Sequence, residues 1–258
     1  MKAIVLFGSG RLTKIIVKSY LDGMLEGYKI LGCYSRTKEH RDSINDMLNV
    51  GHINSFEELI ALKPDYLVEA TSPSSTKEIL ETTLKNKINV ILLSIGALAD
   101  EEYYKHIEGV AKDNGVKIHL ASGAISGFEV LRTARLMGLT KASLTNKKGA
   151  ERLKNTTLYK DGMQDKEMTA FDGSAYEAIK GLPTGINVGV ATALATMGVY
   201  DTRIKINAIP GYVGDSQCID IECGDMVKAH LDVYSKTSDI AGYSVVALLQ
   251  NLNSSIVF

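Results

Sequence analysis

Residues 1–13, MKAIVLFGSGRLT, decide the fold of the N-terminal half. The first seven are largely apolar, as in a buried parallel strand, and Leu12–Leu21 has the pattern of a following helix. Gly8 and Gly10 lie between them, where a tight turn lets a pyrophosphate approach the backbone N–H groups at a helix N-terminus. Thr13 replaces the third glycine, so the fingerprint alone is weak. Its position between strand and helix favours a dinucleotide-binding turn over an ordinary turn.

Short apolar runs continue to alternate with amphipathic stretches up to residue 121. Strands are predicted at 29–34, 66–70, 89–93 and 116–120, with helices between them. The capping box Ser55–Glu58 and the N-terminal Pro73 mark two helix starts. Repeated strand–helix units predict a parallel sheet with right-handed crossovers, so residues 1–121 are interpreted as a Rossmann-type dinucleotide-binding domain.

The pattern changes after residue 121. A glycine-rich turn, Ser122–Gly127, precedes a predicted helix through Met137, and another helix is predicted at 184–199. Alternating segments at 204–209, 218–222 and 228–233 predict a sheet with one covered face. The expected fold class is therefore α/β, with a second α/β (α+β) substrate and dimerisation domain at 122–238. Residues 239–258 are expected to form a C-terminal helix that packs back on the first domain.

The polar stretch Thr145–Asp172 has no clear periodicity. Lys147, Lys148 and Arg152 lie in it and could meet a substrate carboxylate. The sequence favours a solvated connection instead, because polar segments between regular elements usually lie on the surface.

Composition excludes several classes of partner. The 258 residues carry 29 basic and 30 acidic side chains, which gives no global field for nucleic acid or an anionic membrane. Cys33, Cys218 and Cys223 predict neither a disulfide framework nor a zinc site, because their number is odd and the last two have no matching pair. The start of the chain resembles no leader, and no apolar run reaches the ~18 residues that span a bilayer. We expect a cytoplasmic protein with a small-molecule partner.

The end of the second predicted strand indicates which nucleotide is preferred. An acidic residue there would bind the ribose 2′-OH of NAD, whereas a 2′-phosphate needs cations and hydroxyl groups. Ser35, Arg36 and Thr37 occupy this position, and the first carboxylate is Glu39. The sequence predicts a preference for NADP(H), with NAD(H) possible. The alternative is an exposed loop whose arginine stacks on adenine.

Several motifs, taken in order, resemble the L-aspartate dehydrogenase family over essentially the whole chain. They are the glycine turn, Val68–Pro73 (VEATSP), Leu93–Asp100 (LSIGALAD), Ser122–Gly127 (SGAISG), Gly185–Val188 (GINV) and Lys236–Ser238 (KTS). The resemblance implies that Ala124 and Asn187 line the nicotinamide site and that the protein is a homodimer. For Gly123 and Gly127 the alternative is turn geometry, and for Asn187 it is a helix cap.

Together these observations predict one cofactor-binding set. Its members are Gly8, Ser9, Gly10, Arg11, Leu12, Ser35, Arg36, Thr37, Ala70, Thr71, Ser72, Gly96, Ala97, Ala124 and Asn187.

The sequence departs from the family pattern at the position of the acid–base residue. In the family a histidine shortly after an Asp-Pro pair performs acid–base chemistry, and that position is Gln217 here, with Ile209 in place of the Asp. Glutamine cannot exchange a proton near neutral pH. Asp215 is the first-ranked substitute by proximity. The family's acidic residue after a Gly-Gly-Leu turn is also changed, to Glu129, so aspartate specificity is in doubt.

None of the five histidines is an evident replacement, because the sequence shows no paired carboxylate for any of them. They are His40, His52, His106, His119 and His230. Core or solvent-facing positions are expected for all five.

Three functional hypotheses follow. The first is an NAD(P)-dependent oxidoreductase acting on a C–N bond of a small amino acid or imine, as an amino acid dehydrogenase or imine reductase. The second is a catalytically silent NADP(H)-binding sensor, which the replaced histidine motivates. The third is a C–O oxidoreductase of the homoserine dehydrogenase type, which would need a lysine near the hydride acceptor, and the sequence shows none in a recognisable motif. No metal is expected.

Overall fold

The structure is a computed structural model that describes residues 1–125, 127–182 and 185–257. It consists of two compact units. The first contains Met1–Ala97, Glu101–Gly123 and the segment from Asp239, and the second contains Leu98–Asp100 and Ala124–Ser238. Ser126 of the glycine-rich turn, and Thr184 at the start of a predicted helix, lie outside the described residues.

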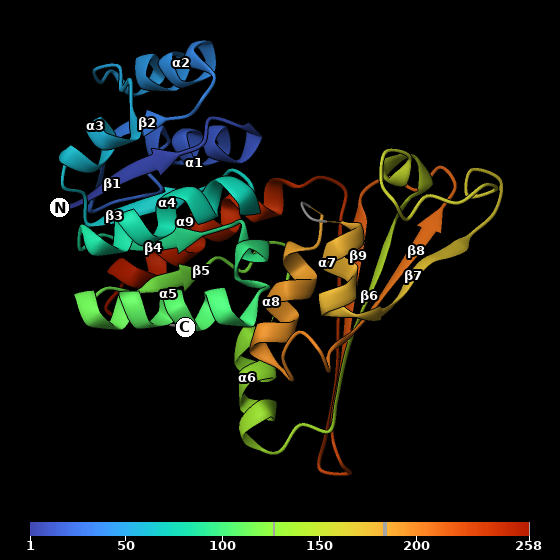
Figure 1. Ribbon diagram of the computed structural model, residues 1–258. Coiled ribbons are helices and arrows are strands. Elements are labelled where there is room, and N and C mark those ends of the chain that lie inside the picture. The colour runs from blue at the N-terminus through green and yellow to red at the C-terminus, as the bar shows by residue number, and fades with distance from the viewer. Residues whose placement is uncertain (126, 183–184, 258) are drawn as a thin grey trace. The chain divides into compact units, whose positions relative to one another are not determined.

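The first unit is a five-stranded parallel sheet with helices between its strands (Figure 1). The strand order β2-β1-β3-β4-β5 places β1 at the point where the order reverses, as in Rossmann-type sheets. The elements are β1 (Lys2–Phe7), α1 (Arg11–Leu21), β2 (Tyr28–Tyr34), α2 (Lys38–Leu48), α3 (Phe56–Ala61), β3 (Tyr66–Glu69), α4 (Pro73–Lys85), β4 (Asn89–Leu92), η1 (Ile95–Leu98), α5 (Glu101–Asn114) and β5 (Ile118–Leu120). The predicted α/β class with a parallel sheet is confirmed.

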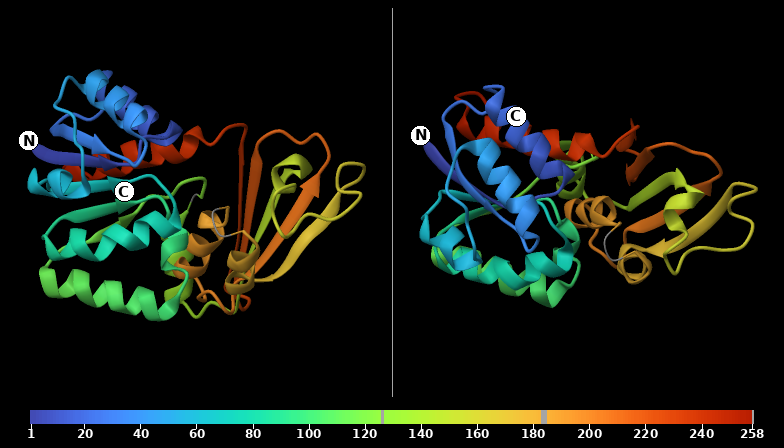
Figure 2. Two further views of the ribbon diagram at one scale, coloured as in Figure 1. Left: turned by 45° about the horizontal axis from the view of Figure 1, so that its top comes forward. Right: turned by 90° about the horizontal axis from the view of Figure 1, so that it is seen from above.

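Both faces of this sheet are buried. Neighbouring residues of β1 point to opposite faces, and both sets are apolar and buried. Ile4 and Leu6 belong to one core cluster with residues of α1, while Val5 points to the other face and is also fully buried. The C-terminal helix α9 (Asp239–Asn253) contributes Val245 and Leu249 to the first cluster. Figures 1 and 2 show α9 alongside α1, and the two helices are in contact.

The second unit is built on a mixed sheet with the strand order β10-β9-β6-β8-β7. β6 and β8 are parallel, and the other neighbouring pairs are antiparallel. Helix α6 contacts β9 and helix α8 contacts β6, so these helices cover one face. The elements are α6 (Phe128–Leu136), β6 (Lys141–Gly149), η2 (Ala150–Leu153), β7 (Met168–Ser174), α7 (Ala175–Gly181), α8 (Asn187–Ala195), β8 (Arg203–Ile209), β9 (Asp215–Cys223) and β10 (Val227–Ser235).

Two expectations about this half were wrong in part. The stretch 145–172 is not simply a connection, since β6 runs to Gly149 and β7 begins at Met168. Pairing with β8 and β9 on both sides gives β6 its backbone partners despite its polar side chains. The helix predicted to reach residue 199 ends at Ala195, and Gly198 then takes a positive φ of 90° that turns the chain.

Candidate functional site

The glycine turn after β1 has the geometry that a bound pyrophosphate requires. Gly8 has a φ of 113°, and a Cβ there would lie 2.5 Å from the carbonyl oxygen of Ala70, so no other residue fits. Gly10 is the N-cap of α1, and no atom lies within 4 Å of where its Cβ would be. The turn therefore leaves open space at a helix N-terminus, where backbone N–H groups favour an anion. These residues fit a dinucleotide.

Side chains of the same turn bind it to the neighbouring strand. Thr13, which replaces the third glycine, donates from its hydroxyl to the carbonyl oxygen of Gly8 at 2.8 Å and is buried. Ser9 Oγ lies 2.6 Å from Ser35 Oγ at the end of β2. The other two predicted residues of the turn have different surroundings. Leu12 packs against the core, and Arg11 forms an ion pair of 2.8 Å with Asp239.

The loop after β2 presents a cation. Arg36 is exposed and forms no hydrogen bond or ion pair within the described part of the chain. Thr37 is the N-cap of α2, and its side chain makes no cap hydrogen bond. A neighbouring cation, Arg41, is instead buried, where it stacks on Tyr34 and donates to the carbonyl oxygen of Ser35 at 3.2 Å. The loop thus has a second cation, Arg41, bound to the backbone of Ser35, which the sequence prediction did not include.

Glu69 organises the next two loops at the same edge of the sheet. It is completely buried and accepts four hydrogen bonds: 2.6 Å from the Thr71 amide, 2.7 Å from the Thr71 hydroxyl, and 2.9 Å each from the Ser94 amide and hydroxyl. Glu69 lies in one of the motifs that resemble the family, but its sequence context alone indicates no role. The sequence feature that could have indicated this role is an acidic residue at the end of an apolar strand, with a hydroxyl residue, Thr71, after that strand and another, Ser94, after the next strand.

We expect Glu69→Gln to lower the free energy of unfolding by about 1–3 kcal/mol, because an amide NH₂ group cannot accept bonds from buried donors. The dissociation constant for NAD(P)H should rise as well, since the loops after β3 and β4 lose their common acceptor. Urea unfolding and fluorescence titration measure the two effects. Glu57→Gln, on an exposed carboxylate, is the control, and equal behaviour of the two variants would contradict this role for Glu69.

The remaining predicted cofactor residues of this unit lie on those loops. Ala70 bonds to the carbonyl oxygen of Phe7, and Ser72 caps α4 through the amide of Ser75. Thr71 is exposed apart from its bonds to Glu69. Gly96 and Ala97 form part of η1, and both are buried. In the second unit Ala124 is half-buried in a turn, and Asn187 is the first residue of α8, whereas Ile186 occupies the N-cap position.

A polar cluster interrupts the helix-covered face of the second sheet. Along β6 the buried residues Ala142 and Leu144 are followed on the same face by Asn146 and Lys148. In the antiparallel register with β9, Asn146 lies opposite Gln217 and Lys148 lies opposite Asp215. The structure therefore brings together both predicted catalytic residues, Gln217 and Asp215, and adds two from the stretch interpreted as a solvated connection.

This cluster has an unusual number of unsatisfied polar atoms. Asn146 Oδ1, Asp215 Oδ1 and Gln217 Oε1 are buried and lack a hydrogen-bond partner among the described residues. The amide nitrogen of Asn146 is engaged, donating to the carbonyl oxygen of Ser216 at 3.1 Å. The other oxygen of Asp215 forms an ion pair with Arg152. Native proteins rarely leave buried acceptors unpaired, so these three oxygens are available to accept hydrogen bonds from water or from a ligand.

Lys148 is the cation of the cluster. Lys148 is 8% exposed. Within the described part of the chain, its side chain forms no hydrogen bond or ion pair. Burial lowers the pKa of Lys148, and Arg152 lowers it further, while the nearby Asp215 acts in the opposite direction. A lysine in this environment can hold an anion, and it gives up its proton more readily than an exposed lysine.

Four of the five histidines are exposed, as expected from the sequence, but three of these have carboxylate partners that the sequence did not reveal. His52 lies 2.8 Å from Asp46, His106 lies 3.0 Å from Glu81, and His230 lies 2.7 Å from Asp220. The partners come from other turns or strands, so sequence spacing did not reveal them. His119 lies in β5 against Tyr66, and burial lowers its pKa.

Comparison with known proteins assigns each half of the chain. Residues 8–121 match the model of the NAD-binding domain of homoserine dehydrogenase, and residues 129–252 match that of the C-terminal domain of aspartate dehydrogenase. The glycine turn and the parallel sheet thus define a dehydrogenase with a nicotinamide-nucleotide-binding domain. No helix in the described residues is both long and apolar enough to cross a membrane.

Full-length relatives define the family more closely. An L-aspartate dehydrogenase of Methanocaldococcus jannaschii is 30% identical, over 98% of this chain and 97% of the relative. One of Methanospirillum hungatei is 31% identical, over 100% and 99%. The crystal structure of aspartate dehydrogenase from Thermotoga maritima has the same fold, with a TM-score of 0.81 at 24% identity over 100% of this chain and 99% of that one. The chain belongs to the aspartate dehydrogenase family, which confirms the resemblance seen in the sequence.

Proposed function

We propose that this protein is an NAD(P)-dependent oxidoreductase acting on the C–N bond of a small amino acid or imine, with an altered proton-transfer group. The observation that carries the proposal is buried, unpaired Lys148 among Asn146, Asp215 and Gln217, in the half that matches aspartate dehydrogenase. An amino acid substrate supplies an ammonium or amine group for the unpaired acceptors and for the adjacent lysine.

The nucleotide supplies the hydride chemistry at its nicotinamide ring. The protein holds it through the turn at Gly8 and Gly10. In amino acid oxidation the substrate nitrogen must lose a proton, the α-carbon must lose a hydride, and a water must then add to the resulting iminium carbon so that ammonia can leave. Gln217 can orient such a group but cannot take the proton. Lys148 has a lowered pKa and lies on the same face, so we assign proton exchange to its Nζ atom.

The proposed cofactor preference is NADP(H), with Arg36 and the hydroxyl groups of Ser35 and Thr37 binding the 2′-phosphate. We expect Arg36→Ala to weaken NADPH binding about 10- to 100-fold and NADH binding by less than about threefold, because only the phosphate needs the charge. Fluorescence titration with both nucleotides measures the difference. Lys38→Ala is the control, because Lys38 is exposed but already paired with Asp42. An equal loss of both nucleotides would support adenine stacking by Arg36 instead.

The first experiment is titration of the protein with NADPH and NADH, followed by a turnover screen with oxaloacetate plus ammonia and with a panel of imines. Tight binding with turnover supports the enzyme. Binding without turnover across the panel supports a second candidate, an NADP(H)-binding sensor, which the glutamine at position 217 favours. Absence of nucleotide binding would overturn both.

The proposal includes a homodimer, which rests on the family resemblance, and a cytoplasmic location, which is the expectation from the sequence. Size-exclusion chromatography with light scattering tests the oligomeric state.

A further inference from the structure

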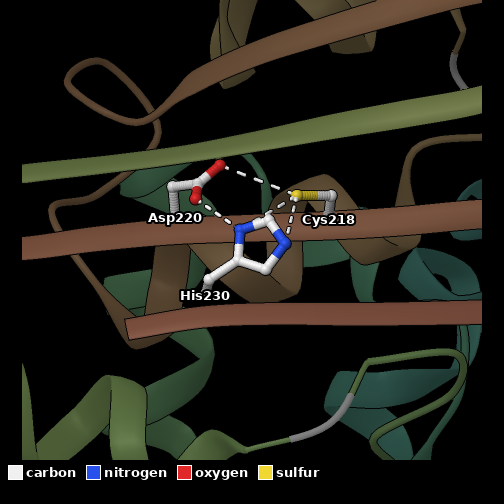
Figure 3. Close-up of side chains that lie close together, drawn as sticks. All are labelled: Cys218, Asp220 and His230. Carbon is white, nitrogen blue, oxygen red and sulfur yellow. Dashed lines mark hydrogen bonds and ion pairs between the residues drawn. The ribbon is translucent and has the colours of Figure 1, made fainter. Parts of the chain in front are cut away.

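Three potential metal ligands meet on the second sheet, on the face opposite to the one that holds Gln217. Cys218 and Asp220 alternate along β9 with the buried residues Gln217, Ile219 and Ile221. His230 lies directly opposite Asp220 on β10. Figure 3 shows the thiol, the carboxylate and the imidazole turned toward one another, and this group of three is called the Cys-Asp-His cluster below.

The distances within the Cys-Asp-His cluster suit a small ion. Cys218 Sγ lies 3.6 Å from Asp220 Oδ2 and 3.6 Å from His230 Nδ1. A tetrahedral zinc ion, with bonds of about 2.3 Å to sulfur and 2.0 Å to nitrogen or oxygen, separates such ligand atoms by about 3.6 Å. His230 Nδ1 and Asp220 Oδ1 are closer, at 2.7 Å, because they share a hydrogen bond. Binding an ion would open that distance by about 0.7 Å, a movement available to two side chains that are not buried.

The types of ligand select among metals. Thiolate and imidazole are poor ligands for calcium or magnesium, and their combination with one carboxylate favours zinc. Asp232 lies opposite Cys218 in the strand register and is held by a hydrogen bond from Ser216 Oγ at 3.1 Å. Its negative charge adds to that of Asp220 and of a Cys218 thiolate, which together favour a divalent cation at this place.

We propose that Cys218, Asp220 and His230 bind a Zn²⁺ ion that joins β9 to β10, with water as the fourth ligand. On binding, the Sγ–H bond of Cys218 breaks, its proton leaves to solvent, and a sulfur–zinc bond forms. His230 and Asp220 each donate a lone pair, and the hydrogen bond between them is lost. The sequence expectation of no zinc site considered only cysteine pairs, whereas here the strand register supplies the other two ligands.

Cobalt(II) is a suitable probe because it occupies zinc sites and makes thiolate ligation visible. The full-length protein, without a histidine tag, is treated with a chelator and titrated with CoCl₂. The expected result is a near-ultraviolet sulfur-to-cobalt charge-transfer band that saturates at one ion per chain and disappears when Zn²⁺ is added. Competition with a colorimetric chelator then gives the zinc dissociation constant.

Variants assign the ligands. Cys218→Ser should abolish the charge-transfer band, and His230→Gln should weaken zinc binding by about 100-fold or more, since even outer-sphere changes cost 10- to 100-fold. His106→Gln is the matched control, because His106 and Glu81 form a similar exposed pair without a thiol. Absence of the band in the unmodified protein, or equal zinc affinity in Cys218→Ser, would overturn the proposal. Neither outcome bears on the proposed dehydrogenase activity, which uses the opposite face.

Discussion

Lys148→Met is expected to lower kcat/KM for amino acid oxidation by about 100- to 10,000-fold, the usual contribution of a positioned acid–base group. NADPH binding should be unchanged, because the residues proposed to hold the nucleotide phosphates lie in the other unit. Methionine has nearly the volume of lysine and removes a buried cation, so the fold should be retained or stabilised. Steady-state kinetics and nucleotide titration on the same preparation separate the two effects.

Lys147 provides the matched control. It is adjacent in sequence, but it is exposed on the other face of β6, so Lys147→Met should leave kcat/KM within about threefold of the unmodified protein. Lys148→Arg tests the nature of the role, because arginine keeps the positive charge but does not lose its proton. If Lys148→Arg restores full turnover, the lysine holds the substrate carboxylate and does not transfer a proton.

The pH profile gives an independent measure. In the oxidative direction Lys148 must be unprotonated to accept a proton, so kcat/KM should rise with pH through the pKa of Lys148. Burial places that pKa below the usual value for lysine. Lys148→Met should remove this limb, whereas a variant that only lowers affinity would keep it.

The first unit was predictable because its local patterns agree with one another. β1 was predicted to within one residue of its bounds, and the parallel order follows from the alternation of strands and helices. The turn at Gly8 could be located because only glycine accepts its φ and its contact with Ala70. The role of Glu69 could not be inferred, because its four donors come from two separate loops that only the tertiary fold brings to one carboxylate.

The second unit shows where sequence patterns mislead. Two adjacent lysines and a glycine at 147–149 are typical of a solvated loop. The period of two at Ala142, Leu144, Asn146 and Lys148 was the opposing signal, but half of its members are polar. Burial of Lys148 depends on Asp215 and on the register with β9, which lies more than 60 residues later and cannot be read from local periodicity.

Gln217→His in the Lys148→Met background is expected to recover at least about tenfold of the lost kcat/KM, because it returns a proton-exchanging group to the family's histidine position. Gln217 is 8% exposed and lies two residues from Asp215 on the same face, so an imidazole there would be a diagonal neighbour of Lys148 across the two strands. The recovered kcat/KM should rise with pH near the pKa of histidine, about 6.5. It should not follow the pH dependence that Lys148 gives to the unmodified protein.

The single variant Gln217→His and the variant Gln217→Asn complete the comparison. Gln217→Asn in the Lys148→Met background cannot exchange a proton and should recover nothing. The coupling energy from the full double-mutant cycle is then the informative quantity, because two groups that perform one task compensate for each other, whereas independent groups contribute additively. If the double variant binds NADPH, unfolds at the same urea concentration as Lys148→Met and remains equally inactive, Lys148 acts through its charge on the substrate, and the proton must be carried by another group such as Asp215.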